Sequence, residues 1–164
     1  KLINISPKEI AQGIRQSYPF HPSIKNLFAR FKENANFQQT RGFIRLVRLM
    51  VQGLFEDGGA AEHQYLINAF DIDLNDSRMA TNISTIKPSL LNAMNKDIAD
   101  KGKAIAESVD SEFNSNGLTQ DIAKLILISS LSTVPGQALG LTSNEIYAWI
   151  SAPNRDIQNI KKQL

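Results

Sequence analysis

Apolar residues recur at helical spacing along most of this 164-residue chain, and this periodicity constrains the fold more than any other feature. After His21-Pro22, one stripe follows the i, i+3, i+4, i+7 pattern: Ile24, Leu27, Phe28 and Phe31. From Gln38 to Phe55, another set of apolar residues falls on one side of a helix: Phe43, Leu46, Val47, Met50 and Leu54. The pattern predicts an all-α protein.

Helix starts are marked by side chains that can accept hydrogen bonds from the free amides of a first turn. Ser6 and Glu9 form a capping-box pattern, which predicts a helix that begins after Ser6 and ends by Pro19. Thr142 and Glu145 repeat this pattern near the end of the chain and predict a further helix there.

The middle of the chain is less regular. Residues 64–74 alternate loosely, and we expect a connector pinned by apolar anchors rather than a strand. Residues 83–113 keep helical spacing, which predicts two helices or one bent helix, with a break or kink at Gly102. Residues 122–131 are apolar nearly all round, so we expect the most deeply buried helix there, with Thr119 as its N-cap.

Composition excludes several classes of site. The chain has no cysteine and only two histidines, so disulfides and thiolate metal sites are excluded and an imidazole site has little to draw on. No apolar run approaches the ~18 residues that span a bilayer, so we expect no membrane partner. We expect a cytoplasmic protein.

The net charge of +2 hides a strong polarity along the chain. Residues 1–55 carry nine basic against two acidic side chains, which gives +7. Residues 56–121 carry five basic against twelve acidic side chains, which gives −7, and residues 122–164 carry four against two, which gives +2. The first block is therefore the one that attracts an anion.

Three arginines stand at i, i+4 and i+7 in the predicted helix of residues 38–55: Arg41, Arg45 and Arg48. They fall within about 60° of one another and opposite the apolar side of the helix. An arginine fork suits phosphate or carboxylate oxygens. Two other interpretations stay open: a solvated polar face, and internal pairing with the acidic middle block.

The last 45 residues have the rhythm helix, loop, helix, short turn, helix, which is typical of a helix-turn-helix unit. We therefore divide the chain into residues 1–113 and a three-helix segment, residues 114–164, packed on them. The last helix carries side chains of the types that contact nucleic acids: Arg155, Gln158, Asn159 and Lys162. The modest +2 of this block and the absence of a wing hairpin weigh against DNA binding.

A family resemblance begins at Tyr18-Pro19-Phe20-His21-Pro22 and continues at Asn36-Phe37-Gln38-Gln39-Thr40-Arg41-Gly42 and Ile44-Arg45-Leu46. Further matching stretches are Phe70-Asp71-Ile72-Asp73-Leu74 and the segment from Leu139 to Leu164 with Leu141-Thr142-Ser143-Asn144-Glu145-Ile146. These stretches resemble the predicted bacterial and archaeal AAA+ ATPases catalogued as domain of unknown function 499. The resemblance runs along most of the chain from Ser17 onward.

The resemblance implies a position downstream of a P-loop core, in the helical lid that closes over bound nucleotide. Residues 1–113 would then be lid-like, and residues 114–164 a partial helix-turn-helix or winged-helix-like unit. In AAA+ proteins an arginine near the start of a lid helix can reach the phosphates and sense the γ-phosphate. Arg41 occupies the matching place, with Thr40 beside it, and Arg45 and Arg48 would touch the core domain.

Catalysis is not expected on this chain alone. It has no Gly-x-x-x-x-Gly-Lys-Ser/Thr loop, since Gly102-Lys103 lacks both the earlier glycine and the hydroxyl residue. We therefore expect no cofactor on this piece, ATP and Mg²⁺ in the full-length protein, and an upstream P-loop domain as partner. A nucleic-acid-binding module and a scaffold or homo-oligomerisation piece are the alternatives.

Overall fold

A computed structural model describes residues 6–32, 40–56, 58–131, 140–152 and 155. Over these residues the fold is all-helical, as predicted, and no strand occurs within them. The helices are α1 Pro7–Ser17, α2 Pro22–Lys32, α3 Thr40–Phe55, α4 Ser77–Ile86, α5 Leu91–Ala93, α6 Ile105–Phe113, α7 Leu118–Leu131 and α8 Ser143–Ile150. Three shorter helical segments lie between them: the 3₁₀ turns Ala60–His63 and Pro88–Leu90 and the π-helical turn Met94–Ile98.

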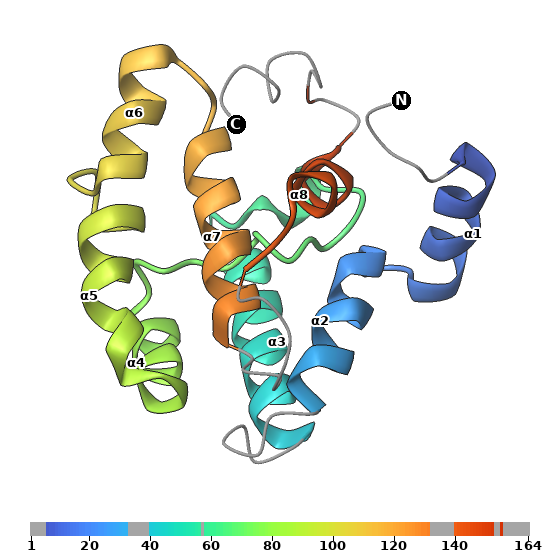
Figure 1. Cartoon of the computed structure of the whole chain (residues 1–164), viewed down its shortest axis with the longest axis horizontal. Helices are drawn as coiled ribbons and strands as arrows, with labels where there is room; N and C mark the ends of the chain where they lie inside the picture. The colour runs from blue at the N-terminus through green and yellow to red at the C-terminus, as the bar shows by residue number, and fades with distance from the viewer. Residues whose placement is uncertain (1–5, 33–39, 57, 132–139, 153–154, 156–164) are drawn as a thin grey trace.

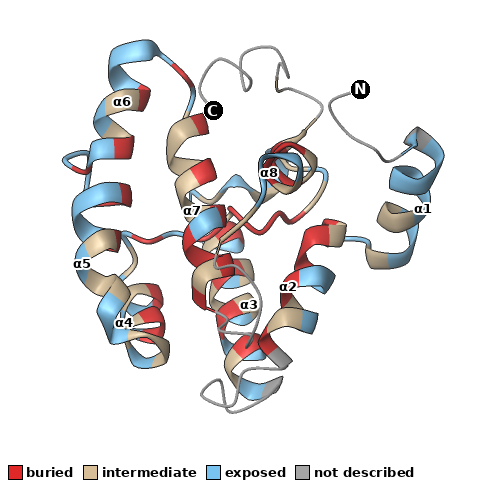
Figure 2. Ribbon diagram, viewed as in Figure 1, coloured by how far each residue is buried: buried red, intermediate tan, exposed pale blue. Residues whose placement is uncertain are grey.

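The helices are arranged around a central group (Figure 1). α2, α3, α7 and α8 lie in the middle, α4, α5 and α6 stand together on one side, and α1 lies at the opposite edge against α2. Buried residues gather on the central helices, whereas α1 shows none among its described side chains (Figure 2).

Both predicted capping boxes are present. The amide of Ser6 donates to Glu9 at 2.7 Å and the amide of Glu9 donates back to the Ser6 hydroxyl at 3.3 Å. At α8 the Thr142 amide donates to Glu145 at 2.8 Å, and the return bond to the Thr142 hydroxyl is 3.3 Å. α1 ends at Ser17, as expected before Pro19. These local signals therefore fixed the helix starts correctly.

The apolar stripes predicted for α2 and α3 form the core. In α3, Phe43, Leu46, Met50 and Leu54 are all at most 7 % exposed. α7 is the most apolar of the described helices in sequence and is buried over much of its surface, as predicted. Its residues and those of α8 belong to the same buried cluster as α2 and α3, so the segments 1–113 and 114–164 share one core.

Residues 64–74 form a connector, as predicted, with Ile67, Phe70, Ile72 and Leu74 buried. A parallel bridge joins Ile67 to Phe20. In this bridge the His21 amide donates to the Ile67 carbonyl at 2.8 Å, and the Ile67 amide donates to the Pro19 carbonyl at 2.9 Å. The connector is thus tied to the start of α2.

The prediction for residues 83–113 was wrong about where helix begins. α4 starts earlier, at Ser77, because the Asp76 carboxylate accepts from the Arg78 amide at 2.8 Å and caps the first turn. It ends at Ile86, because Lys87 precedes a proline and takes a non-helical conformation. The expected break at Gly102 is confirmed, and this glycine has a φ of +91°.

The N-cap assigned to Thr119 was also wrong. α7 begins at Leu118, and its free amides are capped by a carboxylate from α6. Asp110 accepts from the Thr119 and Gln120 amides, each at 2.8 Å, and from the Ser115 hydroxyl. A cap supplied by the preceding helix has no short-range sequence signature, whereas the Thr119 hydroxyl has one, and this difference misplaces the N-cap in the prediction.

Candidate functional site

The outer face of α3 carries the arginine stripe. Arg41, Arg45 and Arg48 are all exposed, on the side opposite the buried Phe43 and Met50. α3 begins at Thr40, so Arg41 lies in its first turn, while the Thr40 side chain lies outside the described residues. The helix therefore presents its basic face outward, with one arginine next to its N-terminus.

None of the three arginines forms an ion pair within the described part of the chain. The ion pairs found among the described residues join other cations to carboxylates: Arg30 to Glu145, Arg78 to Asp76 and Glu56, and Lys124 and Arg155 to Asp121. The stripe is consequently a free source of positive charge among the described residues.

Apolar side chains extend the same face of α3. Ile44 is 57 % exposed and Phe55, at the end of the helix, is 71 % exposed. Phe55 also lines a groove of about 370 Å³ with the exposed Tyr18 and Tyr65, over a floor that includes Leu54. Exposed aromatic and arginine side chains on one surface are typical of an interface.

Arg155 is turned inward. Its guanidinium pairs with Asp121 on α7 and lies over the Phe70 ring, 4.6 Å from the ring centre. The other residues predicted to contact nucleic acid, Gln158, Asn159 and Lys162, lie outside the described residues. DNA contact by this segment stays a prediction.

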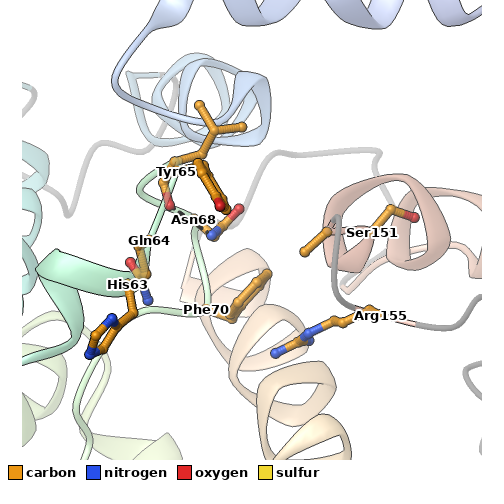
Figure 3. A pocket seen from close by; sticks show the side chains of 9 residues that line it. His63, Gln64, Tyr65, Asn68, Phe70, Ser151 and Arg155 are labelled. Carbon is orange, nitrogen blue, oxygen red and sulfur yellow. Dashed lines mark hydrogen bonds between the residues drawn. The ribbon is translucent and has the colours of Figure 1, made fainter.

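A cavity of about 220 Å³ lies between the connector and the end of α8, and its lining includes His63, Gln64, Tyr65, Asn68, Phe70, Ser151 and Arg155. Figure 3 shows the connector side chains on one side, Ser151 and Arg155 on the other, and the Phe70 ring between them. The wall is therefore part aromatic and part hydrogen-bonding.

A second cavity of about 370 Å³ shares Gln64, Phe70 and Arg155 with the first and adds Asp71, Asp73, Asp121 and Lys124. Gln64 donates from Nε2 to Asp71 at 3.2 Å, and the Asn68 amide donates to the same carboxyl at 2.6 Å. Burial raises the pKa of Asp71, and the Asp121 charge acts in the same direction, against the hydrogen bonds from Asn68 and Gln64.

Sequence reasoning missed both cavities. Their walls come from the connector, from α7 and from the residues after α8, which lie far apart along the chain. Phe70 and Asp71 stood out only within a family motif, and nothing in the sequence paired them with Asp121 or Arg155. Such a site depends on tertiary packing, and local patterns do not reveal it.

Two searches of the described part of the chain concern metal ligands and membrane-spanning helices. It contains no group of three or more histidine or acidic side chains that could hold a metal ion. None of its helices combines the length and the apolar character that crossing a bilayer requires.

The sequence of this chain matches a known protein family. Residues 5–154 match the family model described as DUF499 second domain. The chain belongs to this family. The predicted membership is confirmed over nearly the whole chain, whereas the AAA+ affiliation and the lid assignment stay predictions. No curated protein and no solved structure matches the chain.

Proposed function

We propose that this DUF499 second domain is a non-catalytic helical lid that closes on a nucleotide-binding core domain located elsewhere in its protein. Arg41 would face the nucleotide phosphates, and Arg45 and Arg48 would contact the core domain. The observation that carries the proposal is the exposed arginine stripe of α3, which lacks an ion pair among the described residues.

Electrostatics supports an external anion. Two like charges at positions i and i+4 destabilise a helix by roughly 0.2–0.5 kcal/mol per pair, so the three arginines reduce the stability of α3 when nothing is bound to them. Phosphate oxygens would relieve this repulsion, and an arginine fork binds them with two hydrogen bonds. The position of Arg41 in the first turn adds the positive end of the helix dipole to the guanidinium charge.

The apolar part of the face supports a docked domain over a purely solvated surface. Ile44 lies between the arginines and Phe55 lies at the end of the stripe, and both are more than half exposed. An interface commonly combines arginine with aromatic and aliphatic side chains. A docked domain would remove Ile44 and Phe55 from water, whereas a solvated surface leaves them exposed. The resemblance to AAA+ ATPases supplies the identity of that partner, a P-loop core.

The test uses the full-length protein with Arg41→Ala, and Arg15→Ala on α1 as the matched control, since both arginines are exposed. We expect at least about a tenfold loss of ATP hydrolysis at saturating nucleotide, because one charge-assisted contact contributes ~1.5–3 kcal/mol. ADP affinity should change less, because ADP lacks the γ-phosphate. Hydrolysis and ATP affinity both equal to those of the control would refute the sensing role.

The core-domain contact has a separate test. Arg45→Glu and Arg48→Glu reverse charges on the same face without touching the buried side of α3. We expect these changes to weaken binding between the isolated chain and the core domain, measured by calorimetry, and the weakening to shrink at high salt. Unchanged binding would leave the scaffold or nucleic-acid alternatives as the better explanations.

A further inference from the structure

The turn between α6 and α7 contains the one asparagine of the sequence that precedes a glycine, Asn116-Gly117. Both residues have positive φ angles, 51° and 76°, and the Leu118 amide donates to the Ser115 carbonyl at 3.1 Å. These values describe a type I′ turn, in which both central residues are left-handed. Asn116 is exposed. The turn therefore presents an asparagine side chain to water directly before a glycine.

An asparagine side chain can react with the backbone amide that follows it. The Gly117 nitrogen attacks Cγ of Asn116, the new N–C bond closes a five-membered succinimide ring, and the side-chain NH₂ leaves as ammonia with the amide proton. Water then opens the ring at either carbonyl and gives an aspartate or an isoaspartate. Glycine hinders this attack least, because it carries no Cβ next to the attacking nitrogen.

A second asparagine in the same loop provides an internal reference. Asn114 is exposed as well and has nearly the same φ, 50°. Ser115 follows it, and this residue has a Cβ and an amide that donates to the Asp110 carbonyl at 3.1 Å. Gly117 has no Cβ, and its amide donates to none of the described residues. The two asparagines thus differ in the attacking amide rather than in exposure or φ.

The folded turn holds Asn116 back from this reaction. The first central residue of a type I′ turn has a ψ of about +30°, which places its Cβ and the next nitrogen on opposite sides of the Cα–C bond. Ring closure needs both on the same side, so the turn has to open first. It is held closed by the Leu118 bond and by Ser115, which is 7 % exposed and whose hydroxyl donates to Asp110.

We propose that Asn116 is a modification site that deamidates when the turn between α6 and α7 opens. The rate of the reaction reports how often this turn opens. The isoaspartate product adds one carbon atom to the main chain and no longer fits a four-residue turn. The proposal does not rest on the lid function, because α3 and its arginines take no part in it.

The test incubates the folded 164-residue chain in mildly alkaline buffer beside a synthetic peptide of residues 104–124, which contains both asparagines. Tandem mass spectrometry of the same tryptic peptide locates the change from amide to acid. We expect it at Asn116 before Asn114, and more slowly in the folded chain than in the free peptide. The proposal is overturned if Asn114 reacts first, or if Asn116 of the chain stays intact while the peptide converts to completion.

Ser115→Ala tests whether turn opening controls the rate. It removes the hydroxyl bond to Asp110 and keeps Asn116-Gly117. Loss of one hydrogen bond should raise the open population, and with it the deamidation rate at Asn116, about two- to tenfold. Ser111→Ala, at an exposed position on α6, is the control. A rate equal to that of the control overturns the role of turn opening.

A second measurement covers a Ser115→Ala chain that does not fold. The parent chain is incubated in urea below its unfolding transition, where local opening increases. Deamidation at Asn116 should then speed up with urea concentration, and a rate that stays constant overturns the proposal.

Discussion

The cap that joins α6 to α7 allows a quantitative test of the fold. Asp110 is only 9 % exposed and receives the Thr119 and Gln120 amides, each at 2.8 Å, together with the Ser115 hydroxyl. Asp110→Asn is nearly isosteric but replaces one acceptor oxygen by an NH₂ group. One backbone amide of α7 then faces a donor, and the negative charge at the positive end of the helix is lost.

The magnitude follows from these contacts. A hydrogen bond to a charged group contributes roughly 1.5–3 kcal/mol, and a carboxylate at a helix N-terminus adds roughly 0.3–1 kcal/mol. We therefore expect Asp110→Asn to lower the free energy of unfolding by about 2–4 kcal/mol. The melting temperature should fall by roughly 4–16 °C, since each kcal/mol shifts it by about 2–4 °C in a chain of this length.

Trp149, the only tryptophan, reports on this change because it is 6 % exposed in the core. Urea unfolding followed by its fluorescence should show a lower midpoint with an unchanged slope. Asp97→Asn, at an exposed position, is the control. A variant Asp110→Asn within about 0.5 kcal/mol of that control would refute the capping argument.

The same carboxylate gives a pH dependence. Burial acts to raise the pKa of Asp110, but the hydrogen bonds from Ser115, Gln120 and Thr119 outweigh it and the pKa is lowered. A lowered folded-state pKa gives stability that is present above the unfolded pKa, ~3.9, and is lost as pH falls through the folded value. The difference between the parent and Asp110→Asn should therefore shrink below about pH 4.

Two further changes test the packing. In Gly59→Ala the new Cβ would lie 2.3 Å from the Leu54 carbonyl oxygen, so we expect the free energy of unfolding, measured in urea, to fall by ~1–3 kcal/mol. Gly53 lies inside α3 with open space around the new Cβ, so Gly53→Ala should raise the free energy of unfolding by ~0.5–1 kcal/mol. Burial lowers the pKa of His21 to about 4, so the free energy of unfolding should fall as pH drops from about 6.5 to 4. In His21→Asn the free energy of unfolding should depend less on pH over the same range.

Local sequence signals predicted most of the helical fold. The capping boxes at Ser6 and Thr142 and the stripe of α3 depend on residues three or four positions apart, and helix geometry alone brings those residues together. The start of α4 was missed because the two residues that follow its cap, Ser77 and Arg78, are polar and give no apolar signal of their own. The cap of α7 was missed because Asp110 belongs to another helix.

The candidate sites show the same division between local and long-range information. The arginine stripe could be predicted because Arg41, Arg45 and Arg48 share a helix, and their exposure follows from the burial of the opposite face. The two cavities could not be predicted, because Gln64 and Arg155, which line both of them, lie far apart along the chain.

The two pairing states of arginine in this chain argue for different roles. Arg155 is anchored by Asp121 and Phe70, and removing these partners would leave a partly buried cation without compensation, which destabilises the fold. Arg41 and Arg45 stand in water with no carboxylate among the described residues, so the fold gains nothing from their charge and loses a little to repulsion. Neutralising Arg41 and Arg45 to Gln should therefore leave the free energy of unfolding unchanged or slightly raised while impairing nucleotide-dependent activity of the full-length protein. A marked loss of stability in this double variant would make the stripe a structural element and remove the basis of the lid proposal.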